Sequence, residues 1–72
     1  MNPPLRLMSV DDLLALEKEF YRLEEMYFDS AKYFKAEAGL FNSYAEKAVE
    51  FGEKAVRVRR EIDERLKLAN LL

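Results

Sequence analysis

The sequence predicts an all-α protein: an antiparallel hairpin of two long helices that associates as a homodimeric four-helix bundle. Half of the 72 residues are hydrophobic and 36% are charged, with only two glycines and two prolines, a composition typical of long amphipathic helices. Along two segments, apolar residues recur at alternating steps of three and four, which is the spacing of a coiled-coil seam. Helix stop and start signals lie between these segments. We therefore expect one domain that comprises residues 1–72.

The chain begins with an expected extended segment over residues 1–8. This segment contains Pro3 and Pro4, and proline fixes φ and lacks an N–H donor. Ser9 is the predicted N-cap of the first helix, with an acidic residue three positions later as in a capping box. Nothing interrupts the helical pattern after Ser9 until a glycine. We therefore expect the first helix over residues 9–38.

The turn is predicted at residues 39–42 because stop and start signals coincide there. Gly39 suits the left-handed backbone position that follows many helices. Asn42 or Ser43 can cap the second helix, which we expect over residues 43–70. The alternative is one continuous helix of about 60 residues, since a lone glycine inside a helix costs only about 1 kcal/mol.

The pairing of the two seams favours the hairpin over one continuous helix. On the first helix the seam residues are Leu13, Leu16, Phe20, Leu23, Tyr27, Ser30 or Ala31, and Phe34. On the second they are Tyr44, Ala48, Phe51, Ala55, Val58, Ile62, Leu66 and Ala69. Folding at the predicted turn brings large residues opposite small ones, as close packing requires. The expected pairs near the turn are Phe34 with Ala48, Ala31 with Phe51, and Tyr27 with Ala55.

A second apolar face remains on one flank of the hairpin after the seam residues are paired. Glu24 and Arg59 lie on the same flank and are expected to be neighbours. Large exposed apolar patches mark interaction sites. The simplest way to cover this face is a second copy of the hairpin related by a two-fold axis. We therefore predict a self-association face that comprises Leu14, Tyr21, Phe28, Ala31, Ala38, Ala45, Val49, Gly52 and Val56.

The composition argues against catalysis. The sequence contains no histidine and no cysteine, so the commonest general base and the most reactive nucleophile are both missing. Disulfides and the usual structural zinc sites are excluded for the same reason. We predict no enzymatic activity, no cofactor and no metal site.

Charge and hydropathy indicate a protein partner rather than a nucleic acid or a membrane. The net charge of −2 provides no overall attraction to nucleic acid or to anionic lipid. Charged residues interrupt every stretch that approaches the roughly 20 apolar residues of a membrane span. We expect a cytoplasmic homodimer that acts as an adaptor, assembly or accessory factor for an unidentified protein.

Nucleic-acid binding is the alternative function. The second helix concentrates basic residues, and the candidate contacts are Lys54, Arg57 and Arg60. Acidic residues are interspersed among them, whereas a nucleic-acid footprint is usually an uninterrupted basic stripe. In architecture, the predicted dimer of helical hairpins resembles the Rop family of plasmid RNA-binding regulators. This resemblance implies the fold and names RNA binding as the alternative, but no residue of that family's RNA-contacting surface is matched.

Overall fold

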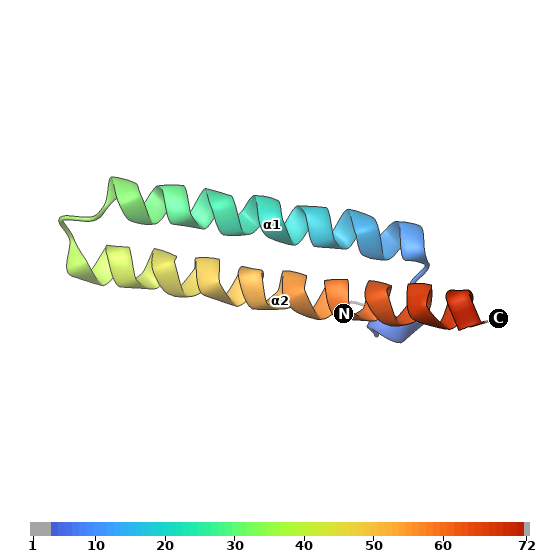
Figure 1. Cartoon of the computed structure of the whole chain (residues 1–72). Helices are drawn as coiled ribbons and strands as arrows, with labels where there is room; N and C mark the ends of the chain where they lie inside the picture. The colour runs from blue at the N-terminus through green and yellow to red at the C-terminus, as the bar shows by residue number, and fades with distance from the viewer. Residues whose placement is uncertain (1–3, 72) are drawn as a thin grey trace.

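The protein is a hairpin of two packed helices, as the sequence predicts. The computed structural model describes residues 4–71 and comprises a 3₁₀ turn η1 (Leu5–Leu7) and the helices α1 (Val10–Tyr33) and α2 (Ala38–Leu71). α1 and α2 lie side by side, and the C-terminal end of α2 extends beyond the start of α1 (Figure 1). The alternative of one continuous helix is therefore excluded.

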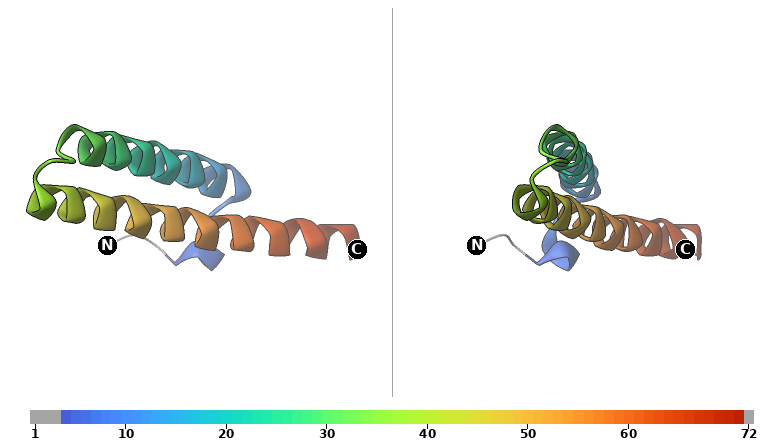
Figure 2. Two further views of the ribbon diagram at one scale, coloured as in Figure 1. Left: turned by 60° about the vertical axis from the view of Figure 1, so that its left-hand side comes forward. Right: turned by 90° about the vertical axis from the view of Figure 1, so that its left-hand side faces the viewer.

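Within the segment that was expected to be extended, Leu5–Leu7 form a 3₁₀ turn. The N–H of Leu7 donates to the carbonyl of Pro4 at 3.0 Å, and the N–H of Met8 donates to Leu5 at 3.1 Å. Proline allows this turn because it restricts only its own φ and removes only its own N–H. The first of the two prolines lies outside the described residues. η1 lies beside the C-terminal half of α2 (Figures 1 and 2).

The predicted N-cap of the first helix is confirmed. The hydroxyl of Ser9 accepts a hydrogen bond from the N–H of Asp12 at 3.1 Å. Asp11 and Asp12 occupy the first turn of α1, where negative charge interacts favourably with the helix dipole. α1 therefore begins where local sequence signals place it.

The predicted position of the turn is wrong. The turn comprises residues 34–37, and Gly39 lies inside the first turn of α2. The N–H of Glu37 donates to the carbonyl of Phe34 at 2.9 Å, and the carbonyl of Glu37 accepts the N–H of Phe41. Between residues 4 and 71 no residue has a positive φ. The glycine signal misled because it applies to turns with a left-handed residue, and this turn has none.

The most deeply buried large side chains lie where η1 covers the hairpin. Leu13, Val58 and Ile62 form this core, and each is at most 1% exposed. The partly buried residues that pack against it are Leu5 of η1, Met8 just after η1, and Leu16 and Phe20 of α1. η1 is held in place by Arg65, whose guanidinium donates to the carbonyls of Leu5 and Met8.

Toward the turn, aromatic rings replace this aliphatic core. Phe51 stacks on Tyr27 with ring centroids 5.5 Å apart, and Phe34 stacks on Tyr44 at 5.6 Å. Phe51 was expected to face Ala31, so its partner lies earlier in α1 than predicted. Phe34 was likewise expected to face Ala48, so both stacked pairs are shifted by four residues, about one helical turn, because the turn itself comes earlier.

The seam of α2 also ends differently from the prediction. Leu66 and Ala69 were expected on the seam, but both are exposed. Arg65 lies inward instead, with its side chain 23% exposed, and it also bonds Glu61 at 3.1 Å. With the shifted register Leu66 is level with the first residue of α1 and Ala69 lies beyond the start of that helix, so α1 does not cover them.

Candidate interaction surface

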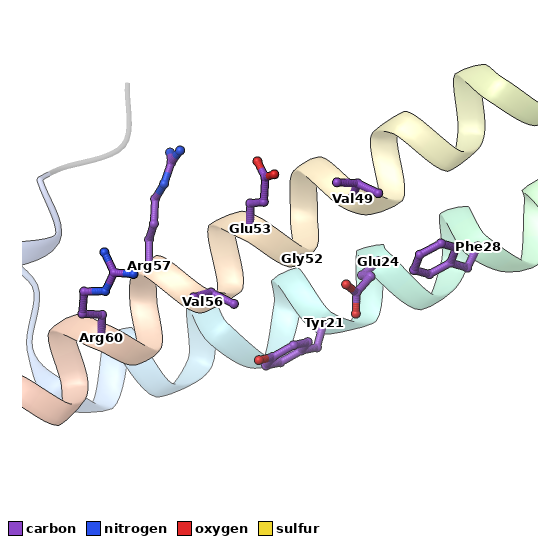
Figure 3. A pocket seen from close by; sticks show the side chains of 9 residues that line it. All are labelled: Tyr21, Glu24, Phe28, Val49, Gly52, Glu53, Val56, Arg57 and Arg60. Atoms are coloured by element: carbon purple, nitrogen blue, oxygen red, sulfur yellow. The ribbon is translucent and has the colours of Figure 1, made fainter.

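An open groove of about 620 Å³ runs along one flank between the two helices. Three of its residues come from α1 and six from α2 (Figure 3). The lining residues are Tyr21, Glu24, Phe28, Val49, Gly52, Glu53, Val56, Arg57 and Arg60. Five of them belong to the predicted self-association face, and the structure brings these five together in one groove.

Four half-exposed apolar side chains line the groove. Tyr21 and Phe28 are seven residues apart on α1, and Val49 and Val56 are seven residues apart on α2. A seven-residue step returns to the same side of a helix, so each pair lies in line along the groove. All four are 41–52% exposed, although side chains of these types are usually buried.

Glu24 and Gly52 form the middle of the groove. A Cβ atom at position 52 would lie 2.1 Å from Oε2 of Glu24, so the carboxylate occupies the space that a side chain would fill. The glycine therefore leaves room for the Glu24 side chain between α1 and α2. Among residues 4–71, Glu24 takes part in no ion pair.

The predicted proximity of Glu24 and Arg59 is wrong by one heptad. Arg59 instead forms a bidentate ion pair with Glu17, at 2.7 Å from Nε and 2.6 Å from Nη2. The hydrogen bonds that Arg59 donates to the Glu17 carboxylate raise the pKa of Arg59 above its ordinary value. Glu17 is the buried charged residue of the described chain, at 7% exposure. The sequence pattern was not used to predict a role for Glu17. The signal that could have found it is its position seven residues before Glu24, on the same side of α1.

The other predicted face residues have different environments. Leu14 is half exposed on α1, Ala31 is buried in the core, and Ala38 is exposed at the start of α2. Ala45 lines a smaller hollow together with Asn42, Glu46 and Val49. Because Val49 also lines the groove, this hollow continues it toward the turn.

The three candidate nucleic-acid contacts do not lie together. Lys54 lies away from the groove, 5.0 Å from the centre of the Phe51 ring and 3.5 Å from Glu50. Arg57 and Arg60 both line the groove (Figure 3). Neither arginine forms an ion pair with any residue of the described chain. Positive charge therefore gathers at one end of the groove.

Residues 4–71 contain neither a metal-binding cluster of side chains nor a membrane-spanning helix. No group of three or more acidic residues within this range could hold a metal ion. Neither of its helices has a stretch apolar enough to cross a bilayer.

Comparisons with family models, curated proteins and solved structures give no match to this chain.

Proposed function

We propose that this protein is a helical interaction module that works as a homodimer and binds a further protein through its outer surfaces. In this proposal two copies close the groove between them and form a four-helix bundle. The supporting observation is the line of half-exposed apolar side chains at Tyr21, Phe28, Val49 and Val56 around the close approach at Gly52. Burial of these side chains provides the driving force for association.

The dimensions of the hairpin are compatible with a stable dimer. Its principal extents are 54 × 24 × 14 Å, so its broad face is larger than the roughly 800 Å² per partner of a standard interface. With a thickness of 14 Å, the hairpin is a single layer of helices. Domains usually bury their apolar faces between two layers, and a second copy supplies the missing layer.

Other exposed apolar residues would be available to the further partner. Leu7 is 72% exposed at the end of η1, and Leu68 is 62% exposed on the part of α2 that extends past α1. Neither residue lines the groove, so dimerisation leaves both accessible. An adaptor requires such a surface in addition to its own dimer interface.

Light scattering on the purified chain tests the dimer. We expect a mass of about twice 8.5 kDa. Val49→Lys should shift the protein toward monomer because it puts a charge into the buried interface, and Gly52→Leu should do the same by adding bulk at the close approach. Tyr33→Lys is the matched control, because Tyr33 is 81% exposed and lies outside the groove. A wild-type monomer would refute the proposal.

Nucleic-acid binding remains the second candidate because Arg57 and Arg60 lie together without acidic ion-pair partners in the described chain. A salt titration with mixed-sequence RNA and duplex DNA separates the two functions. Phosphate contacts release counterions, so nucleic-acid affinity falls steeply with salt. Tight binding that is lost in Arg57→Ala/Arg60→Ala would favour the nucleic-acid function, whereas weak or salt-insensitive binding favours the protein-interaction module.

A further inference from the structure

We propose that the second copy lies antiparallel, with α2 against α2 of its partner, so that Glu46 of each copy meets Arg60 of the other. The inference rests on the proposed homodimer and specifies its two-fold axis. The axis lies across the helices, in the plane between the two copies, at the level of Glu24 and Gly52. Two arguments support it: the spacing of the apolar residues and the charge along the groove.

The apolar residues on both helices share one centre. Glu24 lies about midway between Tyr21 and Phe28, and Gly52 lies about midway between Val49 and Val56. Because Glu24 and Gly52 are in contact, both midpoints lie at the same level of the hairpin. A two-fold axis at that level brings Tyr21 onto Phe28 of the second copy. The same axis brings Val49 onto Val56, so it pairs all four side chains at once.

The charges along α2 match under the same rotation. Glu46 lies in the hollow that continues the groove toward the turn, and Arg60 lies at the opposite end. The two residues are on either side of Gly52 at nearly equal distances along α2, six and eight residues away. Rotation about the axis therefore brings Glu46 next to Arg60 of the second copy, and symmetry repeats the pair.

The axis region also carries negative charge. Glu24 and Glu53 of both copies approach the axis, which opposes association. Arg57 lies one turn of α2 after Glu53, lines the same groove and supplies positive charge there. Within the described chain Arg57 has no ion pair of its own, so it is available for this role.

The rival arrangement has its two-fold axis parallel to the helices and packs α1 against α2 of the second copy at the same level. The contacts between Glu24 and Gly52 and between Glu17 and Arg59 define which residues are level. By this register Asp29 is level with Glu46, so the rival arrangement brings two acidic residues together. Arg60 is level with Leu16 and the neighbouring Glu17, whose buried carboxylate is already paired with Arg59 of its own chain. The antiparallel arrangement gives both Glu46 and Arg60 a partner of opposite charge.

Single-cysteine cross-linking distinguishes the two arrangements, because the sequence contains no native cysteine. Chains with Glu46→Cys are mixed with chains of a different tag length that carry either Arg60→Cys or Asp29→Cys, and a short bismaleimide is added. The antiparallel dimer gives the 46–60 product and little of the 46–29 product. The opposite preference, or neither product from a protein that light scattering shows to be dimeric, overturns the inference.

As a matched control, the cross-linking is repeated with Lys47→Cys in place of Glu46→Cys. Lys47 follows Glu46 but points about 100° further around the helix, its side chain is 57% exposed, and it does not line the groove. We expect little product with Arg60→Cys from this chain. Equal yields from positions 46 and 47 would mean that the cross-links report random collisions, which also overturns the inference.

Charge reversal at position 46 should change the dimer affinity in opposite directions in the two arrangements. Glu46→Arg should weaken the dimer ~3- to 10-fold, since two exposed ion pairs become repulsive, and Glu46→Arg/Arg60→Glu in one chain should restore it. In the rival arrangement Glu46→Arg faces Asp29 and tightens the dimer. Failure of the proposed function is distinguishable, because a monomeric wild-type chain fails the mass measurement before any of these comparisons.

Discussion

At the end of the hairpin that η1 covers, Leu13, Val58 and Ile62 are almost fully buried, whereas toward the turn the buried residues are the alanines Ala31 and Ala48. Two helices alone touch along one line, so they enclose small side chains while larger ones reach solvent at the flanks. A third element is needed to cover large side chains completely. η1 provides it at one end, and at the other end no third element covers the rings.

The aromatic residues of the turn end follow from the same geometry. Phe20, Tyr27, Phe34, Tyr44 and Phe51 stack or tilt against one another along the seam, and all five stay partly exposed. Flat rings bury much of their area against each other even without a third layer. The half-exposed residues of the groove lack such neighbours, and for this reason we assign their cover to a second copy.

The largest expected loss of stability comes from a substitution at the end of the hairpin that η1 covers. Ile62→Ala should reduce the free energy of unfolding by about 2–5 kcal/mol, because it leaves a cavity in a fully enclosed core. Leu68→Ala is the control, with an expected change within about 0.5 kcal/mol, since Leu68 is 62% exposed. Urea unfolding monitored by circular dichroism measures both. If Ile62→Ala does not fold, Ile62→Val should cost about 0.5–1.5 kcal/mol; equal costs at the two positions would contradict the comparison.

A medium effect is expected when η1 is released. Arg65→Met removes the hydrogen bonds to the carbonyls of Leu5 and Met8 and should cost about 1.5–3 kcal/mol. Hydrogen exchange should speed up at the N–H groups of Leu7 and Met8, while amides near the turn keep their protection relative to global unfolding. Uniform acceleration along the whole chain would argue that η1 is not a separate cover. Arg22→Met serves as control, because within residues 4–71 Arg22 pairs only with Glu19, on the exposed surface.

The smallest effect is expected among the rings near the turn. Phe51→Leu keeps an apolar side chain but removes the stacking on Tyr27 and the tilted contact with Phe20, and it should cost about 0.5–1.5 kcal/mol. Thermal unfolding followed by circular dichroism measures the change. A loss as large as that of Ile62→Ala would mean that the turn end is packed as tightly as the end that η1 covers.

The faces of the two helices could be predicted from the sequence, because they depend only on local periodicity. Apolar residues at heptad spacing lie on one side of a helix whatever that helix packs against. Tyr21, Phe28, Val49, Gly52 and Val56 were therefore grouped correctly, and they line one groove. The N-cap at Ser9 was predictable for a similar reason, since it involves residues only three apart.

The register was decided by the tertiary structure alone. A shift of one heptad leaves every seam residue on the seam, so periodicity cannot distinguish the pair of Arg59 with Glu17 from a pair with Glu24. The position of the turn settles that choice. Because residues 34–37 close the hairpin without a left-handed residue, the glycine at position 39 carried no information about it. The inward place of Arg65 likewise depends on η1, a contact between residues almost sixty positions apart, which no local pattern encodes.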